Sequence, residues 1–212
     1  MSSYLHLSLI GSAAFLLGSL PTAYIMLRRF HEKDIRLEGS GNVGARNLYE
    51  VTNSKALGII VLVIDLLKGL GAIVLMRWFG TDGYWTELLA ASAVVAGHNY
   101  SPWIQFKGGR GLATATGVAL MMNPLLILYW CVAWLIVNMI AKNVHLANSI
   151  ATINLPLLAM LFQDLTNVVT SSAVRSFDVI IYVALSICVL ILSKHVRPLL
   201  DFLRQKRQIP MI

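Results

Sequence analysis

Charged residues are scarce in this sequence. Asp, Glu, Lys and Arg make up 13% of its 212 residues, about half of the roughly 25% that is typical of soluble domains. Hydrophobic residues make up 57%, and a soluble fold of this length could not bury that much apolar surface. Many of them lie in long runs with almost no charge, as in membrane-spanning helices. The composition therefore predicts an integral membrane protein.

Cysteine is also rare, and the N-terminus has no basic residue ahead of its first apolar run. Cys131 and Cys188 both lie in apolar runs and lack metal-ligand spacing, so we expect no metal and no other cofactor. A secretory signal needs a basic start and a small-residue cleavage pattern, and neither is present. The first apolar run is therefore predicted to remain in the protein as a helix.

Seven apolar segments predict an all-α, polytopic membrane fold with about seven spanning or partly spanning helices. Residues 111–122 form the shortest segment, which at 1.5 Å per residue extends about 18 Å, against about 30 Å of hydrocarbon. This segment is expected to be a half-helix or a short span in a thinned bilayer. No linker, low-complexity tract or repeat is visible, so residues 1–212 are read as a single domain. The segments are 7–27, 56–78, 84–97, 111–122, 124–141, 146–162 and 177–193.

Basic residues are concentrated on one side of this predicted topology. With seven spans, the loops at 28–55 and 98–110, the turn at Lys142 and the tail from Lys194 share that side. Lys and Arg are enriched in cytoplasmic loops, so the C-terminus is predicted to be cytoplasmic and the N-terminus outside. The same rule explains the net charge of +7 without a nucleic-acid partner. The 14 of 17 basic residues on this side are Arg28, Arg29, Lys33, Arg36, Arg46, Lys55, Lys107, Arg110, Lys142, Lys194, Arg197, Arg204, Lys206 and Arg207.

The first of these loops contains GSGNVGARN at 39–47. It matches the dinucleotide pattern G-x-G-x-x-G, but that pattern requires a preceding strand and a βαβ unit. Glycines nevertheless let backbone N–H groups converge on one anion. The loop is predicted to bind phosphate, and a plain surface turn is the alternative. Its candidate substrate-binding residues are Ser40, Gly41, Asn42, Gly44, Arg46 and Asn47.

The second loop reads HNYSPWIQFKGGRGLAT at 98–114 and leads directly into an apolar helix. A helix N-terminus flanked by cations is suited to phosphate. Two such loops on one membrane face indicate an enzyme that holds two phosphates, or one phosphate at both ends. The candidate residues here are Lys107, Gly108, Gly109, Arg110, Gly111 and Thr114.

Four motifs in register resemble those of the bacterial acyl-phosphate:glycerol-3-phosphate acyltransferases, the PlsY family. GSGNVGARN is similar to the family's GSGNxGAxN, and the second loop is similar to GHxxPxFxxFKGGKGxAT. GSLP at 18–21 and DLLKG at 65–69 fall where the family has GSxP-like and DxxKG stretches. The resemblance is clear from about residue 11 to residue 116 and looser beyond.

The resemblance implies a multi-pass enzyme of the bacterial inner membrane. It would move a fatty acyl group from acyl phosphate to the 1-hydroxyl of glycerol 3-phosphate, giving lysophosphatidate. Acyl phosphate is already activated, so the reaction needs positioning and charge stabilisation. Ser40, Asn42 and Asn47 would hold glycerol 3-phosphate, Lys107 with the following glycines would hold a phosphate, and Lys107 or Arg110 would stabilise the leaving phosphate. The fatty tail would lie between the membrane helices.

Two histidines and one charged pair complete the candidate site. His98 and His195 match the family's GH and RH positions, and each is either the general base or a histidine bonded at a helix end. The substrate phosphate is a third candidate for proton acceptor. Asp65 and Lys68 stand at i, i+3 within a span, which favours a structural ion pair that supports the site. Ser149 is the serine of HLANSI at 145–150, where the family has SLxSI.

Several positions depart from the family pattern. Arg46 replaces Thr, Glu50 replaces Arg, Arg110 replaces Lys, Asn148 alters the serine motif, and Pro198 replaces Asn. A change from Arg to Glu reverses charge at a phosphate site, although Arg46 is spaced to pair with Glu50.

Three alternatives therefore remain open. The chain could be an enzyme with a different acceptor, or a non-catalytic protein that binds phospholipid or acyl phosphate. A transporter, suggested by the charges at 65 and 68, is disfavoured because repeat symmetry is absent.

Overall fold

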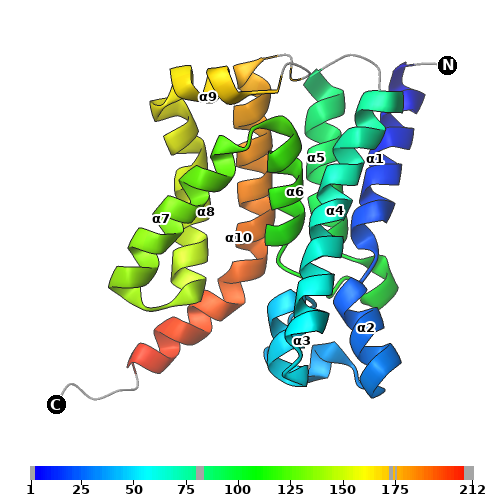
Figure 1. The fold of residues 1–212 in the computed structure, drawn as a ribbon, viewed down its shortest axis with the longest axis vertical. Helices are drawn as coiled ribbons and strands as arrows, with labels where there is room; N and C mark the ends of the chain where they lie inside the picture. Colours follow the sequence, from blue (N-terminus) through cyan, green and yellow to red (C-terminus); the bar gives the residue numbers. More distant parts are fainter. Residues whose placement is uncertain (1–2, 80–83, 172–173, 175, 208–212) are drawn as a thin grey trace.

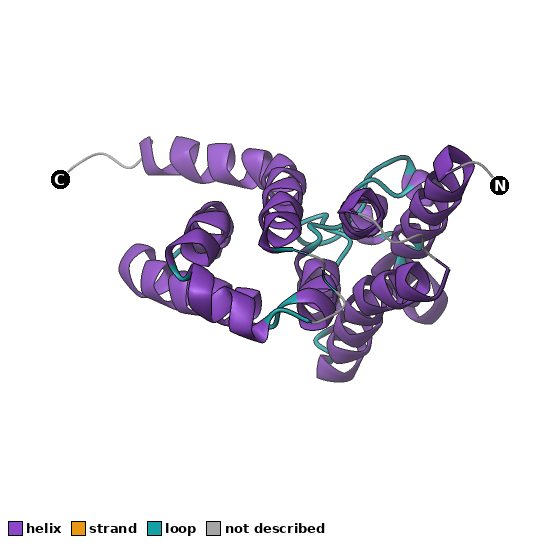
Figure 2. Ribbon diagram, turned by 90° about the horizontal axis from the view of Figure 1, so that it is seen from above, coloured by secondary structure: helices purple, strands orange, loops and turns teal. Residues whose placement is uncertain are grey.

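The apolar runs form helices because a backbone in hydrocarbon must satisfy its own hydrogen bonds. The computed structural model describes residues 3–79, 84–171, 174 and 176–207, and within these ranges every regular element is helical (Figures 1 and 2). The α-helices are α1 Ser3–Ser19, α2 Thr22–His31, α3 Ala45–Thr52, α4 Lys55–Phe79, α5 Tyr84–Asn99, α6 Leu112–Met122, α7 Leu125–Ala141, α8 Val144–Leu161, α9 Gln163–Val169 and α10 Phe177–Arg207, with 3-10 turns η1 Ile35–Leu37 and η2 Pro102–Ile104.

Each of the seven predicted apolar segments is helical, and the all-α prediction is confirmed. Among the described residues, four helical stretches are long and apolar enough to cross a membrane: Tyr4–His31, Lys55–Phe79, Val144–Leu161 and Phe177–Phe202. The helices α5, α6 and α7 are shorter, with 16, 11 and 17 residues. The structure also contains α3 and α9, which the apolar pattern does not predict, and α10 continues well beyond the expected end at residue 193.

The first apolar run is broken into α1 and α2 at residues 20–21. Pro21 has no N–H to donate, so the helical hydrogen-bond pattern is interrupted there. The carbonyl oxygen of Leu20 accepts from the N–H of Thr22 at 3.0 Å and from Nζ of Lys68 at 2.6 Å. Backbone groups at a helix break inside a membrane need such partners. The proline of GSLP and the lysine of DLLKG thus form one structural unit.

Glycines allow α4 and α6 to touch along their backbones. A Cβ added to Gly69 would lie 2.0 Å from the carbonyl oxygen of Thr114, and one added to Gly117 would lie 2.0 Å from that of Leu66. Small residues that permit close approach are typical of membrane helix contacts. This contact fixes α6, and therefore the loop that precedes it, against α4.

We expect Gly69→Ala to force α4 and α6 apart and to destabilise the protein by about 1–3 kcal/mol, the usual cost of overpacking. Thermal unfolding in detergent measures the effect. Gly71→Ala is the matched control, because a Cβ there would make ordinary contact with the Leu17 side chain at 3.5 Å. Equal stability of the two variants would contradict the close contact.

The two ends of the bundle differ. In Figure 1 the start of α1 lies at the top, whereas α2, α3 and the last part of α10 lie at the bottom. Seen from above, the bundle has an elongated cross-section (Figure 2). The start of the first described helix and the end of the last thus lie at opposite ends of the bundle. The number of spans stays a prediction. That the lower end is cytoplasmic stays a prediction from the basic residues.

Candidate active site

The first glycine loop is folded around the side chain of Asn47. This residue is 1% exposed, and its Nδ2 donates to the carbonyl oxygens of Glu38 at 3.1 Å and Asn42 at 3.0 Å. Its Oδ1 accepts from the backbone N–H of Ser40 at 2.9 Å. The sequence predicts a direct substrate contact for Asn47, but in the structure its polar atoms hold the shape of the loop.

The backbone of this loop needs glycine where it turns. Gly39 and Gly41 have φ of 55° and 68°, in the left-handed region that favours glycine. The helix α3 begins directly after Gly44. The first loop therefore lies at a helix N-terminus, which favours anions. This was predicted only for the second loop.

The second glycine loop packs against the first. Gly109 donates its N–H to the carbonyl oxygen of His98 at 3.0 Å. A Cβ on Gly109 would lie 2.1 Å from Nε2 of His98 and 2.6 Å from the carbonyl oxygen of Val43. Gly111 has φ of 79° and precedes the first residue of α6. Residues 39–47 and 107–111 thus meet at one end of the bundle, as two cooperating phosphate loops must.

A buried charge cluster lies beneath the contact between the loops. Asp65 and Lys68 are each 3% exposed, and Nζ of Lys68 lies 2.7 Å from Oδ1 of Asp65. Thr22 bonds both of them through its hydroxyl. The same carboxylate oxygen lies 3.8 Å from Nδ1 of His98. A small cavity beside this cluster is lined by Thr22, His98 and Gly109, among others. The predicted ion pair is present, and through His98 it reaches the second loop.

We expect Asp65→Ala to destabilise the protein by about 3–5 kcal/mol, because it leaves the Lys68 ammonium buried without its counter-ion. The double variant Asp65→Ala/Lys68→Met should recover much of this loss, since an uncharged pair avoids the desolvation cost. Thermal unfolding of the three proteins in detergent gives the comparison. A double variant no more stable than Asp65→Ala would contradict the paired-charge account.

A second polar cluster is formed by side chains of α7, α8 and α10. His195 is 0% exposed; its Nδ1 lies 2.9 Å from the carbonyl oxygen of Ile191 and its Nε2 lies 3.3 Å from Nδ2 of Asn148. Both ring nitrogens are therefore in hydrogen bonds. Trp134 completes the chain by donating its indole N–H to Oδ1 of Asn148 at 2.8 Å. In this arrangement His195 is fixed within the core.

Arg110 joins this cluster to the loops. Its NH1 lies 3.4 Å from Nδ1 of His145. Burial lowers the pKa of the Arg110 guanidinium, Arg46 lowers it further, and Glu50 opposes the shift; the group remains protonated at neutral pH. Arg46 pairs with Glu50, with Nε and Oε1 2.8 Å apart. The pairing that the sequence suggested for Glu50 is thus present.

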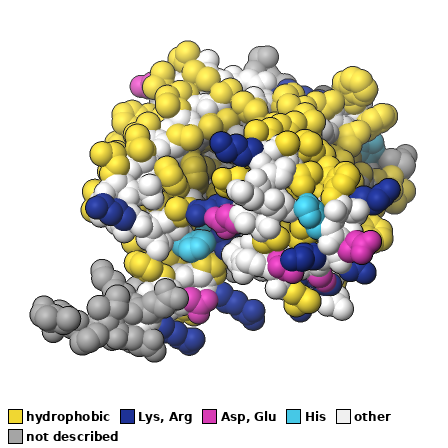
Figure 3. All heavy atoms as spheres, turned by 60° about the horizontal axis from the view of Figure 1, so that its bottom comes forward, with side chains coloured by type: hydrophobic (Ala, Val, Ile, Leu, Met, Phe, Trp, Pro, Cys, Tyr) yellow, Lys and Arg dark blue, Asp and Glu magenta, His cyan; other side chains and the backbone are white. Residues whose placement is uncertain are grey.

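The other predicted residues divide into exposed and buried groups. Ser40 and Lys107 are exposed, and Asn42 and Gly108 are half-buried. Figure 3 shows that charged side chains and histidines gather on the end of the molecule that lies at the bottom of Figure 1. Thr114 and Ser149, by contrast, are buried.

The buried pair differs in its side-chain contacts. The Ser149 hydroxyl donates to the carbonyl oxygen of His145 at 2.9 Å. The backbone carbonyl of Thr114 lies against Gly69, but its hydroxyl is buried with no hydrogen-bond partner among the described residues. Substrate contact by either residue stays a prediction.

Sequence reasoning also missed residues of this region. His145 and Asn148 appear in the sequence only as departures from a serine motif, although both contact predicted site residues. Arg36 contacts the backbone next to Lys107. Its only sequence signal is a place among charged residues just before the first loop.

Comparison with known proteins agrees with the geometry. The sequence profile described as glycerol-3-phosphate acyltransferase matches residues 8–204. Glycerol-3-phosphate acyltransferase 2 of Moorella thermoacetica is 40% identical over 150 residues, covering 71% of this chain and 76% of that protein. A glycerol-3-phosphate acyltransferase of Desulforamulus reducens is 35% identical over 167 residues, covering 78% of this chain and 82% of that protein.

Solved structures show the same fold. The crystal structure of PlsY (YgiH), an integral membrane glycerol 3-phosphate acyltransferase, matches in its glycerol 3-phosphate form with a TM-score of 0.74 and 29% identity, covering 97% of this chain and 96% of that one. Its lysophosphatidic acid form matches with the same TM-score and 28% identity, covering 94% and 92%. The fold and the joined glycine loops define an integral membrane acyltransferase. The chain belongs to the glycerol-3-phosphate acyltransferase family.

Proposed function

We propose that this protein transfers a fatty acyl group from acyl phosphate to the 1-hydroxyl of glycerol 3-phosphate, forming lysophosphatidate. The observation that carries the proposal is the contact between the two glycine loops, since Gly109 packs against the backbone of Val43. Each loop precedes a helix, so two phosphate groups can bind side by side at positive helix ends. Family membership and the matched PlsY forms support the same substrates.

The reaction needs no covalent enzyme intermediate. The hydroxyl oxygen attacks the carbonyl carbon, the bond from that carbon to the phosphate oxygen breaks, and inorganic phosphate leaves. The proton of the hydroxyl passes to a phosphate oxygen, an acceptor already present in the substrates. His195 is unsuited to this step because both of its nitrogens are engaged. The protein acts by holding the two reactants together and by stabilising developing negative charge.

The residues have separate proposed roles. Ser40, Asn42 and Arg46 bind glycerol 3-phosphate beside the N-terminus of α3. Lys107 and the N–H groups that follow it bind the acyl phosphate at the N-terminus of α6. Lys107 then neutralises the departing phosphate.

We expect Lys107→Ala to lower the release of phosphate from palmitoyl phosphate, in the presence of glycerol 3-phosphate, by about 100-fold or more, as when one charge-stabilising donor is removed. The control is Lys55→Ala, which removes an exposed cation at the start of α4 and should retain activity. If the folded wild-type protein releases no phosphate with this acceptor, the proposed function is wrong.

An apolar cavity between the helices is the proposed binding site of the acyl chain. It has a volume of about 220 Å³, lies between α6, α7, α8 and α10, and its lining includes Leu112 at the start of α6 and Ala184 on α10. Leu112 directly follows Gly111, so one end of the cavity adjoins the phosphate loop. We propose that the acyl chain enters here from the loop and extends toward Ala184.

Ala184→Phe should fill the far part of the cavity and shift the preference from palmitoyl phosphate to octanoyl phosphate. Each methylene that loses its apolar site forfeits about 0.8 kcal/mol of binding. Val132→Phe serves as control, because Val132 is half-exposed on α7 and does not line the cavity. The ratio of kcat/KM for the two donors is the measurement, and an unchanged ratio would place the chain elsewhere.

A different acceptor is the second candidate. The Arg46–Glu50 pair puts a carboxylate beside the guanidinium that would bind the acceptor phosphate. Such an arrangement suits an acceptor with additional hydroxyl groups. A panel of polyol phosphates in the same assay separates the two functions, and thermal stabilisation by these ligands without turnover would identify a binding protein.

A further inference from the structure

Lys107 follows two residues with an unusual backbone. Gln105 has φ of 58° and Phe106 has φ of 60°, in the left-handed region that non-glycine side chains rarely adopt. Such conformations persist only where the surroundings hold them. Residues 104–107, which we call the lysine hairpin, are therefore held in place by contacts from outside. Two cations, Arg36 and Lys194, make these contacts.

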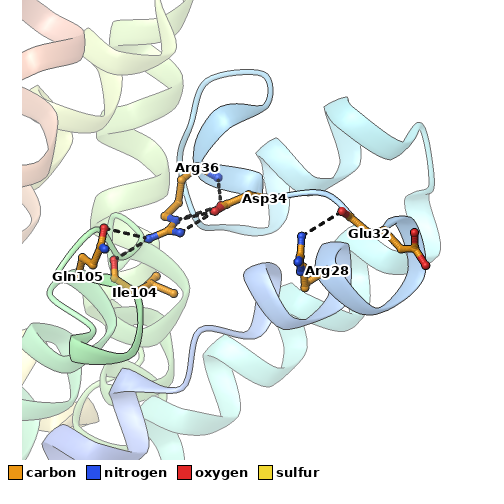
Figure 4. A network of polar contacts seen from close by, with 6 residues as sticks. All are labelled: Arg28, Glu32, Asp34, Arg36, Ile104 and Gln105. Atoms are coloured by element: carbon orange, nitrogen blue, oxygen red, sulfur yellow. Dashed lines mark hydrogen bonds and ion pairs between the residues drawn. The ribbon is translucent and has the colours of Figure 1, made fainter.

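Arg36 holds the lysine hairpin from the side of the first loop. Its NH1 donates to the carbonyl oxygen of Ile104 at 3.3 Å and to Oε1 of Gln105 at 3.5 Å (Figure 4). Its other nitrogens are bound by Asp34, with Nε 2.9 Å from Oδ1 and NH2 2.6 Å from Oδ2. Its Cζ also lies 5.3 Å from the centre of the Tyr24 ring. The guanidinium is thus fixed on three sides.

Lys194 holds the hairpin from the side of α10. Its Nζ lies 3.4 Å from the carbonyl oxygen of Phe106 and 4.3 Å from the centre of the Tyr100 ring. The hairpin is also tied to the preceding backbone, because Phe106 donates its N–H to the carbonyl oxygen of Ser101 at 2.8 Å. The backbone that presents Lys107 is therefore bound by cations from both sides.

An ordinary surface ion pair would not explain the geometry at Arg36. Exposed pairs contribute little, but the side chains of Arg36 and Asp34 are only 21% and 20% exposed. The planar guanidinium binds a carboxylate with one edge and a carbonyl with the other, which the single ammonium of lysine cannot do. Arg36 also lies three residues before Gly39, where the first glycine loop begins. Its contacts therefore connect the segment before the first loop with the lysine hairpin of the second loop.

We propose that Arg36 is a positioning residue for acyl transfer: held by Asp34, it fixes the lysine hairpin so that Lys107 and the first glycine loop keep one relative position. This inference rests on the proposed function. Arg36 acts through Lys107 and the backbone, and substrate contact is not required. Removing Arg36 should therefore reduce turnover of folded enzyme more than it reduces stability.

The state of the pair near neutral pH follows from its charges. The hydrogen bonds from Arg36 hold the pKa of the Asp34 carboxyl below its ordinary value of 3.8. A carboxyl group whose pKa is lowered by folding stabilises the folded state when the pH is above its ordinary pKa. This stabilisation is lost as the pH falls through the lowered pKa of the folded state. Assays near neutral pH therefore report on the intact pair.

The test compares kcat of Arg36→Ala, Arg36→Lys and the wild type, each corrected for the folded fraction. We expect Arg36→Ala to lower kcat by roughly 10-fold or more, because small misplacement of a reacting group is costly. Arg36→Lys should recover little of this loss. Arg28→Ala is the matched control: Arg28 bonds only the nearby carbonyl of Glu32 in Figure 4, and its loss should leave kcat unchanged. Full recovery in Arg36→Lys would overturn the positioning role.

Amide hydrogen exchange without substrate gives a second readout. Arg36→Ala should speed exchange at residues 104–107, and Arg28→Ala should not. Asp34→Asn keeps Arg36 but removes its charged partner, so it should speed exchange at residues 104–107 by a smaller amount. This variant replaces Arg36→Ala in the comparison if Arg36→Ala folds poorly. Unchanged exchange in both variants would overturn the proposal. If the wild type has no acyltransferase activity, the proposed function fails, while the exchange result still decides whether Arg36 holds the hairpin.

Discussion

The buried ammonium of Lys68 is the group on which the site depends most. It donates to the carbonyl of Leu20 where the first membrane run is broken, and Asp65 neutralises its charge. A lone charge within a spanning segment would be costly. Because the same carboxylate lies beside His98, and His98 bonds the Gly109 amide through its own carbonyl, the break, the pair and the second loop form one connected structure.

The loops above this cluster are shaped by backbone more than by side chains. Asn47 uses its amide to hold the first loop, and glycines permit the second loop to pass within contact distance of the first. Both loops end at helix N-termini, whose first N–H groups have no partner within the helix and favour anions. The exposed cations, Lys107 and Arg46, then add charge to a site whose form is already set. The close packing of α4 against α6 keeps that form.

Four of the five departures from the family pattern have partners within this chain. Arg46 pairs with Glu50, Asn148 bonds His195, and Arg110 lies beside His145. A buried charge or amide without a partner would be costly. These contacts show that the substituted side chains are accommodated by their neighbours.

Much of the fold was predictable because hydropathy is a local property of the chain. Six of the seven apolar runs became one helix each, the first became the two helices α1 and α2, and the charged pair at 65 and 68 formed as its i, i+3 spacing indicates. The helix α3 was missed because its eight residues carry too many polar groups to form an apolar run. The end of α10 was misplaced because the run ends at residue 193, whereas the helix continues through Pro198 into a polar segment.

The sequence by itself determined the membrane class, the two glycine loops and the family, since composition and short motifs carry those properties. Only the tertiary structure decided which polar side chains bond within the protein. Asn47 and Ser149 have the chemistry of ligands, yet both bond neighbouring backbone groups. Arg36 lies outside every motif, yet it contacts the backbone beside Lys107. Packing decides which residues distant in the sequence become hydrogen-bond partners, and no local sequence pattern predicts these pairs.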